Sequence, residues 1–427
     1  MSSVSRPVSA AKKLRICVLT AGHLSTSPRM LKAADTLARA GYHVRVVSTR
    51  HVDWATETDR SVRRSREGLW TWRVIDFRRQ GAKRLYLTSG IRSRSARWIG
   101  KQLSPKTLTV GLAARARDRI YPEIVSAVLE ESVDLIYGGG GALAATAESA
   151  RRMGVPFALD LEDFHTGEYA DSAETRVANA FTSRIEREVL PRAALITAGS
   201  REIANAYIER YGVDAIPINN SFPLPETPPD TQPPTGQLRL YWFSQTIGPG
   251  RGLEEIVSGV AAAGIEASLH LRGRPMAGYL AELSQRAVAV APRLRLVDHP
   301  PGAPDEMVSL CRGFDIGLAP ELDSVLNKSL SLSNKALTYI LAGLGVAMTD
   351  TQGQHELGVD LGEGAVLYRP GDVATLGAGL ARWDRDRESL GRAKAASWAA
   401  AKRRWNWDDP RESGRLLEAV TAVLESK

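Results

Sequence analysis

A proline-rich segment, residues 223–236, divides this chain of 427 residues into two parts of similar length. It reads PLPETPPDTQPPTG and holds six of the 22 prolines in 14 residues. Proline cannot donate a hydrogen bond to a sheet and keeps the backbone extended, so this segment cannot continue a regular fold. We interpret it as a linker between two domains, because the chain is also too long for one ordinary core.

Both parts alternate apolar strands with helices. Residues 14–20 are nearly all apolar, as expected for a parallel strand that is covered on both faces. Ser27 and Pro28 then begin a helix that ends at Gly41. We predict further strands at 44–47, 133–137, 157–161, 194–197, 238–243, 267–271, 294–297, 314–319 and 346–349, and further helices at 142–153, 174–190, 252–263, 276–290, 304–312 and 334–342. The pattern predicts an α/β fold of two doubly wound, Rossmann-like domains that face each other across a cleft.

The composition indicates a globular protein of a reducing compartment. Hydrophobic residues make up 43% of the chain and charged residues 24%, which excludes a disordered chain. The two cysteines, Cys17 and Cys311, lie in separate apolar segments and form no disulfide framework. We find neither a signal peptide nor an apolar run that would span a bilayer, and we expect a cytoplasmic protein.

Positive charge is concentrated in residues 60–120. This segment has 17 Lys and Arg against three Asp and Glu, a net charge of +14, whereas the whole chain has +8. Trp70, Trp72, Tyr86 and Trp98 are interleaved with the arginines. One interpretation is a surface that faces anionic lipid, or a lipid-linked anionic acceptor, at the inner membrane face. The other is a solvated arginine-rich helix, since the chain uses 45 Arg against 11 Lys throughout. No nucleic-acid recognition motif accompanies the charge, and we expect no nucleic-acid partner.

Residues 329–356 hold the pattern that most directly indicates a ligand. The helix predicted over 334–342 begins with Asn334, which can cap it, and Lys335 lies in its first turn. A cation in the first turn opposes the helix dipole unless an anion shares the exposed N–H groups. A strand and the loop 350–354 follow. Such a corner in an open α/β sheet suits a phosphate, and it indicates a ligand that carries a nucleotide diphosphate.

Several short motifs occur in an order and spacing found in one group of enzymes. They are 27–29 (SPR), 160–165 (DLEDFH), 198–200 (AGS), 248–254 (GPGRGLE), 333–335 (SNK) and 342–346 (AGLGV), followed by Thr349, Asp350, Gly353 and Glu356. With them the chain resembles the GT-B fold glycosyltransferases, and specifically the family-4 group of retaining enzymes, over roughly residues 14–410. The resemblance implies transfer of a sugar from a nucleotide-sugar to an acceptor, without a catalytic metal or another cofactor.

The resemblance also implies a function for each domain. Residues 1–222 would form the acceptor-binding domain, and residues 237–400 would form the nucleotide-sugar-binding domain. Residues 401–427 would form a C-terminal helix that crosses back to the first domain.

Three residues are assigned as catalytic. Arg251 occupies the place of the family's basic residue after the glycine-rich turn, and Lys335 is the second cation that would stabilise the leaving diphosphate. His165 lies just beyond a strand, where the family places a histidine that faces the sugar and the acceptor. Each also has a structural interpretation: the two cations would be surface residues, and a lone histidine is more often structural.

The remaining candidates bind substrates. Glu162 and Asp163 would orient the acceptor hydroxyl, unless they only cap the next helix, and Arg29 would be a weaker acceptor contact. The residues assigned to the donor are Gly22, Ser244, Gln245, Gly248, Asn334, Thr338 and Glu356. No residue is assigned to a metal.

The chain departs from the family pattern at two places. The usual pair of glutamates eight positions apart would fall on Leu330 and Thr338, and neither is acidic. Residues 244–246 (SQT) stand where many members carry a second arginine. Ribose binding must therefore differ here or be weaker, and a catalytically silent relative is conceivable.

We therefore expect a retaining glycosyltransferase whose acceptor is a glycan, a lipid-linked molecule or a small molecule. One alternative is a non-catalytic GT-B protein that binds a sugar nucleotide or partners another transferase. A second is a sugar-nucleotide epimerase. A nicotinamide dehydrogenase is disfavoured, because the residues after the first strand lack the glycine fingerprint.

Overall fold

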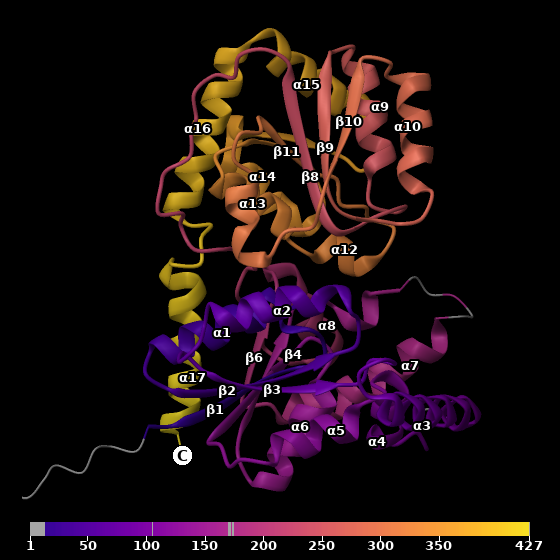
Figure 1. The fold of residues 1–427 in the computed structure, drawn as a ribbon. Helices are drawn as coiled ribbons and strands as arrows, with labels where there is room; N and C mark the ends of the chain where they lie inside the picture. Colours follow the sequence, from indigo (N-terminus) through magenta and orange to yellow (C-terminus); the bar gives the residue numbers. More distant parts are fainter. Residues whose placement is uncertain (1–12, 105, 170–171, 173–174, 427) are drawn as a thin grey trace, which may run out of the picture.

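The computed structural model describes residues 13–104, 106–169, 172 and 175–426, which form two α/β domains stacked end to end (Figure 1). The first domain contains a parallel sheet in the order β3-β2-β1-β4-β5-β6-β7. Its strands are β1 (Arg15–Thr20), β2 (His43–Arg50), β3 (Thr71–Asp76), β4 (Leu135–Gly139), β5 (Phe157–Leu161), β6 (Leu195–Ala198) and β7 (Ile216–Pro217). The order reverses between β1 and β4, as in doubly wound folds.

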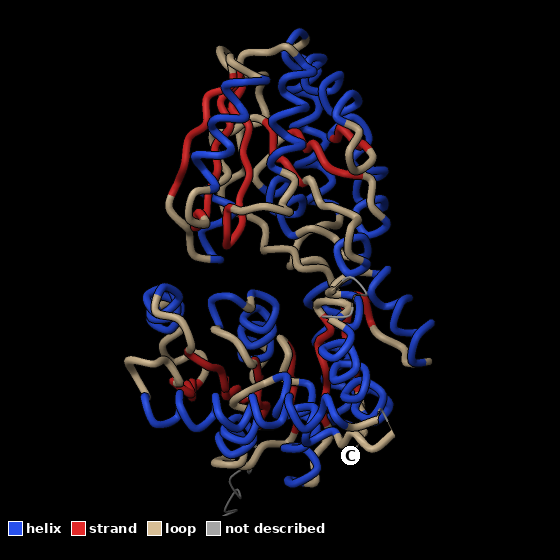
Figure 2. Tube along the Cα trace, turned by 90° about the vertical axis from the view of Figure 1, so that its right-hand side faces the viewer, coloured by secondary structure: helices blue, strands red, loops and turns tan. Residues whose placement is uncertain are grey.

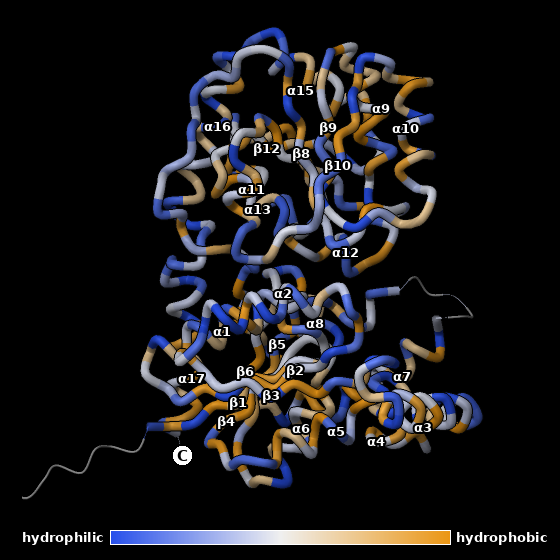
Figure 3. Tube along the Cα trace, viewed as in Figure 1, coloured by the Kyte–Doolittle hydropathy of each residue, from blue (hydrophilic) through white to orange (hydrophobic). Residues whose placement is uncertain are grey.

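Helices cover both faces of this sheet, which explains why its central strands are mostly apolar (Figure 3). They are α1 (Pro28–Arg39), α2 (Trp54–Arg64), α3 (Lys83–Gln102), α4 (Val110–Arg117), α5 (Tyr121–Val128), α6 (Leu143–Met153), α7 (Arg176–Val189) and α8 (Arg201–Tyr211), with short 3-10 turns η1 (Leu24–Thr26), η2 (His165–Gly167) and η3 (Leu190–Arg192). Among the described residues, no helix is both long and apolar enough to cross a membrane.

The second domain contains a parallel sheet in the order β10-β9-β8-β11-β12-β13. Its strands are β8 (Leu238–Ile247), β9 (Ala267–Pro275), β10 (Leu294–His299), β11 (Ile316–Ala319), β12 (Gly345–Thr349) and β13 (Ala365–Tyr368). Its helices are α9 (Leu253–Ala263), α10 (Tyr279–Val290), α11 (Met307–Leu310), α12 (Leu326–Leu330), α13 (Asn334–Leu341), α14 (Gln352–Leu361), α15 (Val373–Arg385) and α16 (Arg387–Arg403), with 3-10 turns η4 (Pro304–Glu306) and η5 (Gly362–Gly364). The fold class predicted from the sequence is confirmed, and Figure 2 shows each sheet enclosed by helices.

Three local predictions were wrong. The helix predicted over 304–312 is a 3-10 turn followed by four helical residues. The predicted loop 350–354 already contains the start of α14 at Gln352. Asn334 is the first residue of α13 and not its cap, because Ser333 holds the cap position and turns its hydroxyl toward Glu321 instead.

The end of the chain returns to the first domain. After α16, a short turn η6 (Pro410–Gly414) leads into α17 (Arg415–Glu425), which packs against α1 and β6. Leu416, Val420 and Leu424 of this helix belong to the same buried cluster as residues of β1 and β2. The Tyr42 hydroxyl forms a 2.9 Å hydrogen bond with Thr421.

The two segments that join the domains lie side by side. The Trp407 backbone N–H donates to the Phe222 carbonyl at 2.8 Å, and the Leu224 N–H donates to Asp408 at 2.8 Å. The Lys32 ammonium lies 4.7 Å and 4.8 Å from the ring centres of Phe222 and Trp407. These contacts fix the first domain against both segments.

Candidate active site in the interdomain cleft

A pocket of about 520 Å³ lies between the two domains, at the carboxyl ends of their strands. From the first domain it is lined by Ser25, Thr26, Pro28, Trp54, Thr58, Glu162, Asp163 and Phe222. From the second domain it is lined by Phe243, Ser244, Gln245, Arg251, Arg272, Arg274, Pro301, Gly302, Pro304, Met307, Asn334 and Lys335. In doubly wound folds the carboxyl ends of the strands are where ligands bind.

The pocket brings together seven of the thirteen residues that the sequence indicated. They are Glu162, Asp163, Ser244, Gln245, Arg251, Asn334 and Lys335. The six that do not line it are Gly22, Arg29, His165, Gly248, Thr338 and Glu356.

A cluster of charges lies at the second-domain wall, where Arg251 and Lys335 line the pocket and Glu321 and Lys328 lie next to them. The Lys335 ammonium contacts Glu321 at 2.6 Å, and the Lys328 ammonium donates to the Gly250 carbonyl at 2.9 Å, next to Arg251. Burial is the main cause that lowers the pKa of Lys328, and Arg251 and Lys335 act in the same direction. Three cations and one carboxylate leave this cluster with a net charge of +2.

Two of these residues, Glu321 and Lys328, were not found from the sequence. Burial would raise the pKa of Glu321, but Lys335 and the Ser333 hydroxyl outweigh it and lower that pKa. Glu321 lies two residues after the end of β11, and a carboxylate close to a strand end was the available indication. Its pairing with a lysine fourteen positions later is a tertiary contact.

Carboxylates face the cluster from the first domain. Glu162 and Asp163 follow β5, and the Asn220 amide donates to Glu162 at 3.0 Å. Burial, reinforced by the charge of Asp163, raises the pKa of Glu162 to about 7. A carboxyl group with such a pKa can accept or hold a proton near neutral pH.

The first-domain wall is also held by a buried pair of a histidine and an aspartate. His23 Nδ1 lies 2.6 Å from Asp59, and His23 Nε2 accepts from the backbone N–H groups of His51 and Val52 at 3.1 Å. The other oxygen of Asp59 accepts from the backbone N–H and the hydroxyl of Ser25. This network positions the turn η1 at the pocket.

Contacts across the cleft hold the two walls in register. The Arg274 guanidinium lies 4.6 Å from the ring centre of Trp54. The Asn327 amide donates to Asp163 at 2.8 Å and its carbonyl accepts from the Phe164 N–H at 2.7 Å.

Comparison with known proteins agrees with this architecture. Residues 26–219 match the family described as "Glycosyl transferase 4-like domain". These residues of the first domain are similar to that family, and the whole chain has the GT-B fold seen in solved glycosyltransferase structures. Comparison with curated protein sequences finds no match to this chain.

Solved structures share the fold over almost the whole chain. Sucrose-phosphate synthase from Thermosynechococcus elongatus superposes with a TM-score of 0.69 at 12% identity, over 97% of this chain and 100% of that one. HepE from Anabaena, in complex with UDP, gives 0.61 at 16% identity over the same shares. A TarM variant from S. aureus, in complex with fondaparinux, alpha-GlcNAc-glycerol and UDP, gives 0.62 at 7% identity, over 97% and 99%.

His165 lies beside the GT-B cleft but is turned into the first domain. It sits in η2 with its Nδ1 2.6 Å from Glu168, and its Nε2 is buried without a partner among the described residues. Burial lowers the pKa of His165, but the hydrogen bond and charge of Glu168 outweigh this and raise it. Its catalytic role stays a prediction.

Arg29 is buried below the cleft in an ion pair. Its Nε and Nη2 donate to the two oxygens of Asp160 at 2.8 Å and 2.6 Å, and a third N–H donates to the Ile218 carbonyl. Only 5% of the Arg29 side chain and 2% of the Asp160 side chain are exposed. This geometry indicates a structural role for Arg29, and its contact with the acceptor stays a prediction.

The other predicted residues outside the pocket have local partners. Gly22 accepts from the Thr49 N–H, and Gly248 packs against Met276. The Thr338 hydroxyl is fully buried and donates to the Asn334 carbonyl at 2.7 Å. Glu356 pairs with Arg404 at 2.6 Å and with Arg201 of the first domain at 3.4 Å. Leu330, at the other family glutamate position, is buried in the core.

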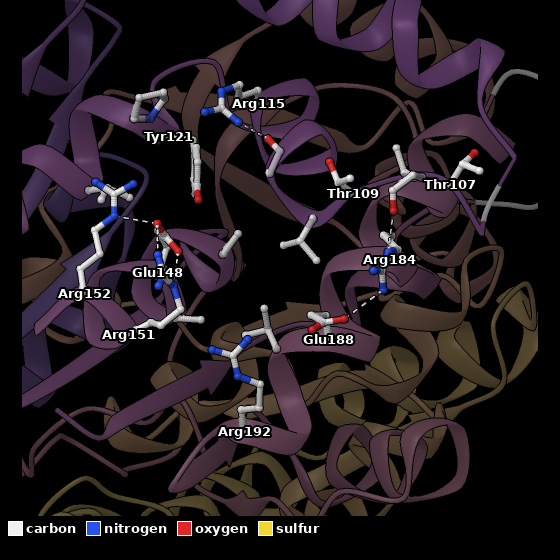
Figure 4. A pocket seen from close by; sticks show the side chains of 18 of the residues that line it. Thr107, Thr109, Arg115, Tyr121, Glu148, Arg151, Arg152, Arg184, Glu188 and Arg192 are labelled. Atoms are coloured by element: carbon white, nitrogen blue, oxygen red, sulfur yellow. Dashed lines mark hydrogen bonds and ion pairs between the residues drawn. The ribbon is translucent and has the colours of Figure 1, made fainter. Parts of the chain in front are cut away.

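A second hollow of about 560 Å³ lies in the first domain, between α4, α5, α6 and α7 (Figure 4). Its rim carries Lys106, Arg115, Arg151, Arg152, Arg184 and Arg192, with Glu148 and Glu188 among them. Hydrogen bonds from Arg151 and Arg152 hold Glu148 and lower its pKa to about 2. None of the predicted site residues lines this hollow.

Proposed function

We propose that this GT-B protein is a retaining glycosyltransferase that moves a sugar from a nucleotide-diphosphate donor to a glycan, lipid-linked or small-molecule acceptor. The observation that carries the proposal is the interdomain pocket, where Arg251 and Lys335 face Glu162 and Asp163. Cations on one wall and carboxylates on the other suit a donor diphosphate and an acceptor hydroxyl. UDP in HepE and TarM, and UDP-glucose in a second HepE structure, support a nucleotide-sugar as the donor class.

The charge of the cluster matches the group that leaves. Transfer passes through an oxocarbenium-like state while negative charge gathers on the diphosphate. The net +2 of Arg251, Lys328, Lys335 and Glu321 would balance the two charges of a nucleotide-diphosphate sugar. The N-terminus of α13, at Asn334, adds free N–H groups on the same wall. Cations preorganised in a closed cleft are worth several kcal/mol to such a transition state, on the order of the effect of an oxyanion hole.

The reaction needs no further cofactor in this proposal. The acceptor oxygen bonds to the anomeric carbon, and the bond from that carbon to the phosphate oxygen breaks. The acceptor proton passes to the departing phosphate on the same face of the sugar, so the configuration is retained. Glu162 in its ionised form accepts a hydrogen bond from the acceptor hydroxyl and orients it toward that carbon.

The first experiment is a thermal-shift screen of UDP-, GDP- and dTDP-sugars. A ligand at a hundred times its dissociation constant stabilises the folded protein by about 2.7 kcal/mol, which raises the melting temperature measurably. The bound donor is then incubated with and without a panel of acceptors, and the anomeric configuration of any product is read by NMR. Retention supports the proposal.

Other outcomes identify the alternatives. A donor that binds but is not turned over with any acceptor identifies a non-catalytic binding protein. A donor that isomerises without an acceptor identifies an epimerase.

Variants of the cation cluster test the site. Arg251→Gln and Lys335→Gln should each weaken donor binding about 10- to 100-fold, since charge-assisted hydrogen bonds contribute about 1.5–3 kcal/mol. Arg385→Gln, an exposed cation of the same domain outside the cleft, is the matched control and should bind like the parent. Unchanged affinity in both cluster variants would place the donor elsewhere.

A further inference from the structure

The helix α3 exposes its large apolar residues instead of burying them. Leu87, Ile91 and Trp98 are 51%, 58% and 68% exposed, and Ile99 and Leu103 at its end are also exposed. With 3.6 residues per turn, the first three fall within about 40° of the helix circumference and form one stripe. Helices of soluble proteins normally bury such an apolar stripe, whereas α3 exposes it to solvent.

The buried face of α3 explains why the stripe stays outside. Small residues face the domain: Ser89, Gly90, Ser93, Ala96 and Gly100. A methyl group added at Gly100 would lie 2.6 Å from the Phe181 ring of α7, so the helix already approaches its neighbours closely. The helix therefore packs on the domain through small residues, and none of the described residues of the first domain covers the stripe. Figure 1 places α3 at the periphery, away from the second domain.

The flanks of the stripe are positively charged. The helix has no Asp or Glu, and Arg84, Arg94 and Lys101 are exposed within about 60° of the centre of the stripe. None of these three has an acidic partner among the residues that the structure describes. By contrast, Arg66, Arg73 and Arg78, which precede the helix in the basic segment, are all paired with carboxylates. The basic hollow of Figure 4 begins at Lys106, just after α3, and extends the positive region.

We propose that the exposed face of α3 docks on the surface of an anionic phospholipid bilayer, at the cytoplasmic face of a membrane. An apolar stripe with tryptophan, flanked by unpaired cations, is the pattern of a helix that lies in a lipid interface. A protein partner with an apolar groove would match the stripe but would need an acidic rim to match its flanks. The bilayer offers apolar depth and negative charge together.

The test is co-sedimentation of the full chain with vesicles. Vesicles of phosphatidylcholine alone are compared with vesicles that contain phosphatidylglycerol at about 30 mol %. We expect binding to the anionic vesicles only. Binding should fall steeply between about 0.01 M and about 1 M salt, where the Debye length shrinks from about 30 Å to about 3 Å.

Two variants separate the two parts of the surface. In Arg84→Gln/Arg94→Gln/Lys101→Gln, affinity for anionic vesicles should fall on the order of 100-fold, since each cation near the surface contributes about fivefold. In Leu87→Ser/Ile91→Ser/Trp98→Ser, it should fall at least about tenfold, and the blue shift of tryptophan fluorescence on binding should shrink.

Matched controls lie on the second domain. Arg295→Gln/Arg385→Gln/Lys402→Gln removes three exposed cations, and Val288→Ser/Val359→Ser removes two exposed apolar residues. Both should bind vesicles like the parent, and thermal melts should show every variant folded.

Three results would overturn the proposal. One is no binding to anionic vesicles at low salt, and another is equal binding by the α3 variants and the parent. The third is a concentration-dependent dimer, seen by light scattering, that the apolar variant abolishes; the stripe would then be covered by a second copy of this chain. Because these readouts do not depend on sugar transfer, they stand apart from the proposed function.

Discussion

Replacing Arg29 by methionine should destabilise the first domain more than it affects substrate binding. Arg29 holds both oxygens of Asp160, and both side chains are at most 5% exposed. Removing one partner of a buried ion pair leaves an uncompensated charge and costs about 3–5 kcal/mol. The Thr197 hydroxyl, at 2.6 Å, and the Tyr137 hydroxyl, at 3.3 Å, would still donate to Asp160. We therefore expect a loss of about 3 kcal/mol, at the lower end of that range.

Calorimetry measures this loss. For a domain of this size, about 1 kcal/mol shifts the melting temperature by about 2–4 °C, so the transition of the first domain should fall by about 6–12 °C. The second domain should melt unchanged. The control Arg29→Met/Asp160→Asn removes both charges and should recover a large part of the loss.

The pH dependence gives a second readout. Burial alone would raise the pKa of Asp160, but Arg29 outweighs it and lowers that pKa in the parent. The pair therefore stabilises the parent at neutral pH, and this contribution is lost as the pH falls through the lowered pKa. In Arg29→Met the pKa of Asp160 rises instead, so the penalty disappears as the pH falls below about 4. The difference between parent and variant should shrink toward acidic pH. A melting temperature within about 2 °C of the parent, with a raised KM for the acceptor, would refute this reasoning and favour an acceptor contact.

Three further changes test other parts of the site. Glu162→Gln should lower kcat/KM by about 100-fold or more and remove the rise of kcat/KM with pH near pH 7, because the pKa of Glu162 is about 7; an unchanged pH profile would exclude Glu162 from the reaction. Gly199→Ala would place a methyl group 2.3 Å from the Glu162 carbonyl oxygen, so the rate of sugar transfer and the melting temperature should both fall. A variant with parental activity would show that the backbone at Glu162 can move away from the added methyl group. The pairing with Glu168 raises the pKa of His165, so the pair stabilises the folded protein fully below the ordinary pKa of about 6.5, and this stabilisation is lost as the pH rises through the raised pKa. In His165→Gln the melting temperature should lose this part of its pH dependence between pH values of about 5.5 and 8.5. An unaltered pH dependence would contradict the pairing.

The sequence predicted the fold well where strands are buried on both faces. The strand β5, for example, has the predicted bounds, because all of its residues are buried and all but Asp160 are apolar. The edge strand β3 was missed, since its residues alternate in exposure and include Arg73. In the basic segment an arginine-rich helix was one of the two interpretations, but the bounds of α3 could not be predicted because arginines are spread over the whole segment. Helices α4 and α5 were not predicted.

Site residues could be predicted where their position near a strand end brings them to the pocket. They could not be predicted where the direction of the side chain decides whether it lines the pocket. Glu162, Arg251 and Lys335 converge because parallel strands end at one edge. The 3-10 turn η2 rotates His165 inward, and Thr338 lies on the buried side of α13. Such rotations depend on packing partners that are far away in the chain.

The return of α17 to the first domain makes the second domain an insertion within the first. Both ends of the inserted part meet where the Trp407 N–H bonds the Phe222 carbonyl, and Asp408 holds Leu224 beside them. A short loop from Phe222 to Trp407 would bypass residues 223–406 and leave every strand of the first sheet, and α17, in the same polypeptide. The first domain should thus be obtainable as a separate folded unit, whereas a cut after residue 222 would remove α17, a helix that covers its core.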